Sequence, residues 1–259
     1  MAPLHLIPKD CVIPEGTVLE QGVILEPRVV LAGEGIVIRM NARVGAAAVI
    51  GEKVSIGQGA CVRPGAVVLR SIPPNAIVEG NPAQVVGYVE GAVRGHPTKG
   101  AGLRHFDTRS FHDSQRPSRI PLEVGDSAVY LMRRFSDPRG ALTVGEVPTE
   151  LPFAPARFFT VFNVPSVELR GEHAHKQCEQ FLICVHGSVR VLLDDGERRC
   201  EVTLDRPDLG VYMPAMIWGT QYRYSADAVL LVFASRPYEA EDYLRTYDDF
   251  LIQLERLNT

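Results

Sequence analysis

Two histidines separated by a single residue are the side chains in this sequence best placed for chemistry. On a strand, residues two apart project from the same face. His173 and His175 would therefore hold their imidazoles side by side, separated along the chain only by Ala174. The reference pKa of histidine, about 6.5, lets the ring accept and return a proton near neutral pH. The pair indicates a site for acid–base chemistry on one face of a strand.

Metal binding is the alternative use of such a pair, because neutral imidazoles bind zinc, iron, copper or nickel. A His-x-His followed four residues later by Glu179 resembles the first metal motif of the cupin superfamily. Cupin metal sites usually take a further histidine from a Pro-Gly-x-x-His motif. The matching stretch here, Met213 to Gly219, contains no histidine, and none follows His186. We therefore favour proton transfer without a metal, with a three-ligand metal site as the alternative.

The elements that must position this pair are short strands. After Ile120, apolar segments of strand length alternate with turn signals, a pattern typical of a β-barrel or sandwich. The clearest hairpin joins residues 188–193 to residues 198–204 through Asp194-Asp195-Gly196. Near the end, a charged stretch predicts a short amphipathic helix from its apolar residues Tyr243, Tyr247, Phe250, Leu251 and Leu254.

The first ninety residues follow a different rhythm, with a branched aliphatic residue at every sixth position. We place the inward-facing residues on this ladder and infer a two-residue slip near Gly33. The pattern predicts a triangular prism of parallel strands, in which residues 11 to 72 form three to four coils of about eighteen residues each. The ladder consists of Val12, Val18, Ile24 and Val30, then Ile38, Val44, Ile50, Ile56, Val62 and Val68.

The segment from Ser71 to Ala83 resembles the closing signature of hexapeptide-repeat acyltransferases. The resemblance covers roughly residues 11 to 88 and implies a left-handed parallel β-helix that assembles as a trimer and binds acyl-CoA between coils. No histidine occurs from residue 6 to residue 95, and the long loop of the sugar N-acetyltransferases is absent. We therefore expect mainly an assembly module, with an acetyl-CoA-binding transferase as the alternative.

Length and composition are those of an ordinary two-domain protein of 259 residues with a net charge of -4, which does not favour a nucleic-acid partner. Its five cysteines show no CxxC spacing, so neither a disulfide framework nor a zinc ribbon is indicated. No stretch approaches the roughly 18 apolar residues of a membrane span. We expect no membrane partner and a cytoplasmic location.

The predicted domains are a β-helix at residues 1–90, a linker at 91–119 and a barrel at 120–259. The linker is assigned from its Gly, Arg, His, Ser and Pro content. We assign no chemistry to its histidines, His96, His105 and His112. The predicted fold class is all-β, with a left-handed parallel β-helix followed by a cupin (jelly-roll) barrel and a short terminal helix.

Several motifs within residues 120 to 252 resemble the WxcM-like C-terminal family of dTDP-sugar 3,4-ketoisomerases, which are cupin barrels. The resemblance implies that the histidine pair lies beside a bound thymidine diphosphate-sugar and that an upstream arginine lines the site. Some members of that family are fused to a hexapeptide acetyltransferase, in agreement with the present domain order. The motifs are Asp137-Pro138-Arg139-Gly140, Arg157, Arg170 to Lys176, Asp194-Asp195-Gly196, Met213-Pro214 and Asp242 to Asp248.

The predicted substrate-binding residues begin with two arginines. Arg157 matches the arginine of the family, and with Arg170 it is a candidate to bind the diphosphate, since guanidinium groups bind phosphate through paired donors. Either arginine could instead form a structural salt bridge. Gln180, Trp218 and Tyr222 complete the predicted set, with a core role as the alternative for the two aromatic residues.

The leading hypothesis is a 3,4-ketoisomerase acting on dTDP-4-keto-6-deoxyglucose, with His173 and His175 as the catalytic pair and no cofactor or metal. The expected assembly is a homo-oligomer, either a trimer or a dimer of trimers. Three alternatives remain open: a bifunctional ketoisomerase and sugar N-acetyltransferase using acetyl-CoA, a non-catalytic sugar-nucleotide-binding protein, and a metal-dependent cupin dioxygenase.

Overall fold

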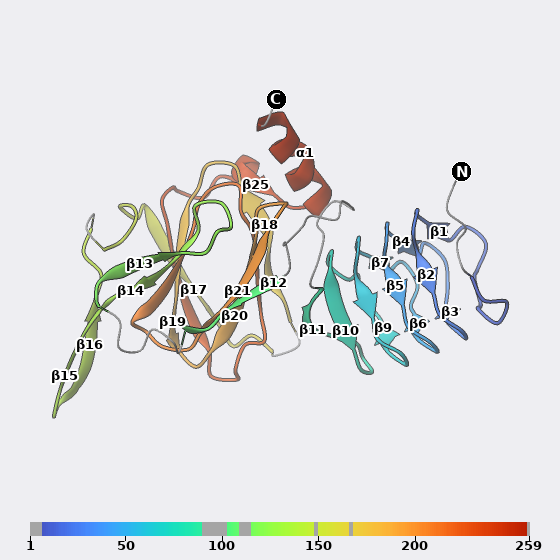
Figure 1. The fold of residues 1–259 in the computed structure, drawn as a ribbon, viewed down its shortest axis with the longest axis horizontal. Coiled ribbons are helices and arrows are strands. Elements are labelled where there is room, and N and C mark those ends of the chain that lie inside the picture. The colour runs from blue at the N-terminus through green and yellow to red at the C-terminus, as the bar shows by residue number, and fades with distance from the viewer. Residues whose placement is uncertain (1–6, 90–102, 109–114, 148–149, 166–167, 258–259) are drawn as a thin grey trace. The chain divides into compact units, whose positions relative to one another are not determined.

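The computed structural model describes residues 7–89, 103–108, 115–147, 150–165 and 168–257. The chain divides into two compact units, Met1–Gly91 and Ala92–Thr259. Among the described residues, no helix has both the length and the apolar character needed to span a membrane. The described part is nearly all β-structure (Figure 1), which confirms the predicted fold class.

The N-terminal unit is a three-sided helix of parallel two-residue strands (Figure 1). Its sides are the sheets β1-β4-β7, β3-β6-β9 and β2-β5-β8, and the last of these continues into the closing hairpin β10–β11. The strands are β1 (Val18–Leu19), β2 (Ile24–Leu25), β3 (Val30–Leu31), β4 (Val37–Ile38), β5 (Arg43–Val44), β6 (Val49–Ile50), β7 (Ser55–Ile56), β8 (Cys61–Val62), β9 (Val67–Val68), β10 (Ala76–Glu79) and β11 (Gln84–Tyr88).

The six-residue period is present, but the predicted inward ladder is wrong in the first coil. Leu25 and Leu31 are 2% and 1% exposed, whereas Val18 and Ile24 are 49% and 44% exposed. Each of the strands β1 to β9 has two residues, and the second one points inward. Because both residues are aliphatic in the first coil, residue type alone did not identify the inner one. Leu31 is followed on the inner ladder by Ile38, so the irregularity near Gly33 is one extra residue, not two.

The C-terminal unit is built from two six-stranded sheets, ordered β12-β21-β20-β23-β18-β25 and β13-β14-β22-β19-β24-β17 (Figure 1). Their facing sides enclose the main apolar core. The strands are β12 (Leu103–Phe106), β13 (Ser118–Pro121), β14 (Ala128–Leu131), β17 (Arg157–Phe162), β18 (Arg170–His175), β19 (Gln180–His186), β20 (Val189–Asp194), β21 (Arg199–Leu204), β22 (Leu209–Met213), β23 (Trp218–Tyr222), β24 (Val229–Ala234) and β25 (Tyr243–Leu244).

Part of the segment expected as a linker is ordered as strand. β12 pairs in parallel with β21, and β13 already begins at Ser118. Of the three histidines in the expected linker, His105 lies on β12, whereas His96 and His112 lie outside the described residues. The composition of this segment therefore did not indicate that it contains an edge strand of the barrel.

A hairpin and a helix complete the unit. The hairpin is formed by β15 (Arg133–Asp137) and β16 (Gly140–Val144), which pair only with each other. Helix α1 (Tyr247–Leu257) is capped by Thr246, whose hydroxyl accepts a hydrogen bond from the Asp249 backbone N–H at 3.1 Å. This confirms the predicted terminal helix, but Tyr243, which was counted among its apolar residues, lies on β25 instead.

Candidate active site

The strand that carries both histidines contains a bulge just before them. The register between β18 and β23 shifts between Gly171 and His173, and Glu172 has a φ of 51°. Gly171 has a φ of 79°, and a Cβ on this residue would lie 2.6 Å from the Gly219 carbonyl oxygen. The site therefore needs glycine here, both for backbone conformation and for space.

The bulge turns the Gly171 carbonyl oxygen toward the first histidine. His173 Nδ1 lies 2.8 Å from this oxygen, and because a carbonyl can only accept, Nδ1 carries the hydrogen. Nε2 is buried and has no hydrogen-bond partner among the described residues. Burial lowers the pKa of His173, and the nearby Arg245 charge adds to this effect, while the bond to Gly171 opposes it. His173 is therefore a neutral imidazole with an available lone pair on Nε2.

The second histidine is held at both ring nitrogens. His175 Nδ1 lies 2.7 Å from Asp242 Oδ2, and its Nε2 lies 3.1 Å from the side-chain nitrogen of Gln180. Its side chain is 3% exposed. Burial is the main cause that lowers the pKa of His175 to about 4, against the opposing hydrogen bond to Asp242. At neutral pH this ring is also uncharged.

The ring of one tyrosine lies beside the rings of both histidines. Tyr243 lies directly opposite His175 in the register of β18 and β25. Its ring centroid is 4.3 Å from that of His175 and 5.0 Å from that of His173, and the two histidine rings are 5.0 Å apart. Three rings with proton-carrying groups thus lie together at one end of the barrel.

Two arginines supply positive charge beside these rings. Arg157 donates a hydrogen bond to the Tyr243 hydroxyl at 3.3 Å, and its buried Nε has no hydrogen-bond partner among the described residues. The Arg245 guanidinium stacks 4.4 Å from the Tyr243 ring centroid and donates to the Tyr238 hydroxyl at 3.4 Å. Arginine donors that remain unpaired beside neutral imidazoles suit an anionic ligand with an acidic C–H or O–H group.

The metal alternative has a candidate cluster, but not the predicted one. His175, Cys178 and Asp242 could each offer a ligand atom, and these atoms lie within 4.8 Å of one another. The hydrogen bonds of the Asp242 carboxylate account for this proximity. Glu179, the carboxylate of the metal motif, accepts a hydrogen bond from Tyr212 instead. Within the part of the chain that the structure describes, the candidate ligands differ from the set expected of a cupin metal site.

The structure corrects the prediction for Trp218 and Tyr222. His173 pairs with Gly219 in the register, so Trp218 and Tyr222 project from the opposite face of β23. Trp218 packs against the helix, with its ring 5.3 Å from that of Tyr247. The core role considered for these aromatic residues is therefore the one that the structure supports for Trp218.

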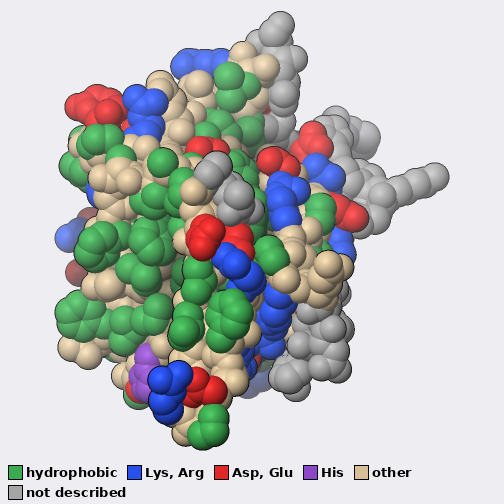
Figure 2. Space-filling model, turned by 90° about the vertical axis from the view of Figure 1, so that its left-hand side faces the viewer, with side chains coloured by type: hydrophobic (Ala, Val, Ile, Leu, Met, Phe, Trp, Pro, Cys, Tyr) green, Lys and Arg blue, Asp and Glu red, His purple; other side chains and the backbone are tan. Residues whose placement is uncertain are grey.

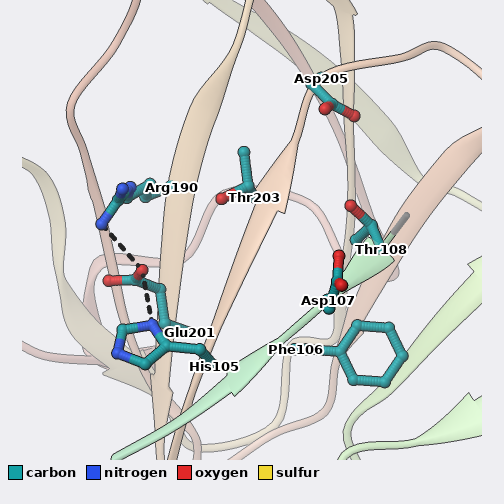
Figure 3. Close-up of a pocket in the computed structure, with 8 residues that line it drawn as sticks. All are labelled: His105, Phe106, Asp107, Thr108, Arg190, Glu201, Thr203 and Asp205. Carbon is teal, nitrogen blue, oxygen red and sulfur yellow. Dashed lines mark hydrogen bonds and ion pairs between the residues drawn. The ribbon is translucent and has the colours of Figure 1, made fainter. Parts of the chain in front are cut away.

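Tyr222 belongs to a separate polar cluster on that outer face. Its hydroxyl donates to Glu201, which also binds Arg190 at 3.0 Å and His105 at 3.1 Å. His105, Arg190 and Glu201 also line a hollow on β12, β20 and β21 (Figure 3). Tyr222 is therefore placed away from the histidine pair.

Of the other three predicted binding residues, two lie at the histidine pair and one does not. Arg157 and Gln180 lie at the histidine pair, through Tyr243 and His175 respectively. Arg170 begins the same strand as the histidines but is exposed.

Sequence reasoning missed four residues of the site, namely Tyr238, Asp242, Tyr243 and Arg245. Asp242, Tyr243 and Arg245 lie within the motif Asp242 to Asp248, which indicates the family, and Tyr243 also fits the apolar pattern of a helix, but neither pattern assigns a role at the site. Asp242 is 67 positions from its partner His175 along the chain, and no periodic pattern links positions so far apart.

Comparison with known proteins gives a consistent set of relatives. The family model described as WxcM-like, C-terminal (FdtA) matches residues 125–255. A protein of Aneurinibacillus thermoaerophilus, named TDP-4-oxo-6-deoxy-alpha-D-glucose-3,4-oxoisomerase, is 38% identical over 133 residues, which cover 51% of this chain and 96% of that protein.

Two solved structures of the 3,4-ketoisomerase QdtA from Thermoanaerobacterium thermosaccharolyticum resemble this chain. A double mutant in complex with TDP has a TM-score of 0.50 and 30% identity, and the match covers 52% of this chain and 97% of that one. A histidine-to-asparagine mutant in complex with TDP-4-keto-6-deoxyglucose has a TM-score of 0.50 and 29% identity, covering 51% of this chain and 96% of that one.

Proposed function

This chain belongs to the WxcM-like, C-terminal family, and we propose that its C-terminal unit is a 3,4-ketoisomerase of TDP-4-keto-6-deoxyglucose. The observation that carries the proposal is the unpaired Nε2 of neutral His173, buried beside a second neutral imidazole. The relatives named as TDP-sugar ketoisomerases and the QdtA complexes with TDP and its sugar support the substrate class.

The proposed reaction moves a ketone from C4 to C3 of the sugar. The C4 carbonyl acidifies the hydrogen on C3, so a base can remove it as a proton. The C–H electron pair becomes the C3–C4 double bond of an enediolate, and the negative charge is placed on the C4 oxygen. The C4 oxygen then takes up a proton, the C3 hydroxyl loses its own, and a proton returns to C4, which produces the 3-keto sugar. The step is redox-neutral and needs a group that is basic near neutral pH.

The proposed role of each residue in this reaction follows from its contacts. His173 takes the carbon-bound proton, because its Nε2 is the ring nitrogen free to accept it. His175, with its ring centroid 5.0 Å away, exchanges protons with the sugar oxygens. Arg157 and Arg245, which flank Tyr243, bind the diphosphate.

Proton NMR in deuterium oxide tests this function. Purified protein and TDP-4-keto-6-deoxyglucose should give a 3-keto product with solvent deuterium in the ring. His173→Asn should slow the reaction by roughly 100-fold or more, the range of a lost general base. The matched control is His186→Asn, because that histidine is 68% exposed and pairs with Asp227 at the surface.

The outcomes separate the alternatives. Wild-type protein that gives neither deuterium incorporation nor a 3-keto product overturns the proposal, and tight TDP binding in that case supports a non-catalytic binding protein. Full activity of His173→Asn excludes this ring as the base. Activity that is lost in EDTA and restored by a divalent ion replaces the proposal with a metal-dependent reaction.

We further propose that the N-terminal unit acts mainly in assembly. Valines lie on the outward positions of the sheet β3-β6-β9, where Val12, Val30, Val49 and Val67 are in register. Such an apolar row supports packing of one β-helix against another in a homo-oligomer.

A further inference from the structure

The Asp242 carboxylate accepts hydrogen bonds from His175 and from two backbone amides. It is 9% exposed and ends the short 3-10 helix Ala240–Asp242. Its Oδ2 accepts from His175 Nδ1 at 2.7 Å and from the Cys178 backbone N–H at 3.3 Å. Its Oδ1 accepts from the Gln177 backbone N–H at 2.8 Å. The carboxylate is thus fixed to the histidine and to the turn that follows it.

These contacts determine which nitrogen of His175 carries the hydrogen. An ionised carboxylate can only accept hydrogen bonds, so Nδ1 must donate. Burial tends to raise the pKa of Asp242, but the bonds from His175 and the backbone amides outweigh it, and the net effect is to lower the pKa. Nε2 of His175 is then the acceptor, in agreement with the Gln180 amide 3.1 Å away.

The two catalytic candidates therefore share one tautomer, set by two different acceptors. The Gly171 carbonyl holds His173, and the Asp242 carboxylate holds His175. Of these two acceptors only the carboxylate carries charge, so it also stabilises a proton that arrives on His175 during the reaction.

We propose that Asp242 is a positioning residue, which holds His175 with its hydrogen on Nδ1 and so keeps Nε2, beside Gln180, available as a proton acceptor. The catalytic part of this inference rests on the proposed ketoisomerase function. The tautomer part does not, because it follows from contacts among Asp242, His175 and Gln180 alone.

Asp242→Asn is the informative variant because it keeps the shape of the side chain. The shorter contact, from the Gln177 N–H, favours keeping the amide oxygen at the Oδ1 position. The amide nitrogen then faces His175 Nδ1, and two donors cannot pair. The hydrogen of His175 should move to Nε2, which leaves no acceptor for substrate at that nitrogen.

The test combines NMR and kinetics on the full chain. Long-range proton–nitrogen spectra of nitrogen-15-labelled protein report the tautomer, and the His175 signals are assigned with His175→Gln. We expect an Nδ1–H tautomer in the wild type and in Gln180→Met, and an Nε2–H tautomer in Asp242→Asn. The variant should lose roughly 10- to 100-fold in kcat with little change in KM, as when a partner that orients a histidine is removed. Asp242→Glu, which keeps the charge, should recover part of the loss.

Each result decides one part of the inference. An Nε2–H tautomer in the wild type overturns it, even if Asp242→Asn fails to fold. A changed tautomer with unchanged kcat overturns the positioning role. Wild-type protein that shows the Nδ1–H tautomer but does not convert the sugar contradicts the proposed function and leaves the tautomer assignment standing.

Discussion

His173 and His175 owe their chemistry to the loss of water around them. Burial disfavours the charged form of an imidazole, and here it is the first cause of the lowered pKa of both rings. Hydrogen bonds to Gly171 and Asp242 act in the opposite direction but are outweighed. The consequence is a pair of bases that are unprotonated at neutral pH and ready to accept a proton.

The pH dependence of activity should reflect this shift. A base must be neutral to act, so kcat/KM should be at its plateau above the folded-state pKa and fall as the pH drops through it. Because the pKa of both rings is lowered, that of His175 to about 4, the acid limb should lie below pH 6.5. Initial rates between pH 4.5 and 8 measure it, with circular dichroism at each pH to exclude unfolding. An acid limb centred at 6.5 or above contradicts the assignment.

At the residue scale, the sequence was sufficient to place a site side chain where its position depends only on neighbours along the chain. The alternation of a strand correctly placed His173 and His175 together. It could not place Trp218 and Tyr222, because which face of β23 is inward depends on its register with β18. Asp242 carried no local signal, since its partner His175 is 67 positions away.

The element that completes the site is a strand of two residues. β25 contributes Tyr243 to the inner face, beside the histidines, and Leu244 to the outer face. So short a strand has little stability of its own. Helix α1 follows directly and buries Tyr247 and Phe250 against Trp218, and Tyr247 also donates a hydrogen bond to buried Asp194 at 2.7 Å. The helix therefore holds β25 in place.

Phe250→Ala tests this anchoring. Phe250 is 0% exposed, and such a truncation costs about 3–5 kcal/mol of unfolding free energy through lost packing and a cavity. We expect a lower denaturation midpoint and, below it, a reduced kcat as Tyr243 and Asp242 lose their fixed positions. Urea titration and the deuterium oxide assay measure the two effects. Ile252→Ala on the same helix, where the side chain is 47% exposed, is the control and should change neither. Equal effects of the two substitutions would contradict the anchoring role.

At the element scale, periodicity predicted kinds of structure better than boundaries. The six-residue repeat predicted the β-helix, yet it misplaced the inner ladder before Ile38 because the outer positions of the first coil are also aliphatic. These outer positions lie on three different sides of the prism. On the side β3-β6-β9, the outer residue Val30 is in register with Val49 and Val67, so this side has a row of valines on its outer face.

At the scale of the whole molecule, the described residues form an apolar surface on each of the two units. The outward valines of the sheet β3-β6-β9 form the first. The second lies on the C-terminal unit, where Figure 2 shows hydrophobic side chains gathered on one face. Phe158 and Phe162 of the edge strand β17 are 69% and 56% exposed and contribute to the outer face of that sheet. Large exposed apolar areas on a protein mark interfaces.

Two separate interfaces would produce the dimer of trimers among the expected assemblies. The valine row would join three β-helices, and the phenylalanine face would join two barrels, since a twofold axis brings identical patches together. Native mass spectrometry should then show a hexamer for the wild type. A charge on the valine row, Val49→Lys, should leave dimers, because burying an unpaired ammonium against apolar side chains is unfavourable. Phe158→Asp should leave trimers for the same reason. If a substitution leaves the hexamer intact, the surface that carries the substitution is not an interface of the assembly. A wild type that is monomeric at micromolar concentration would contradict both proposed interfaces.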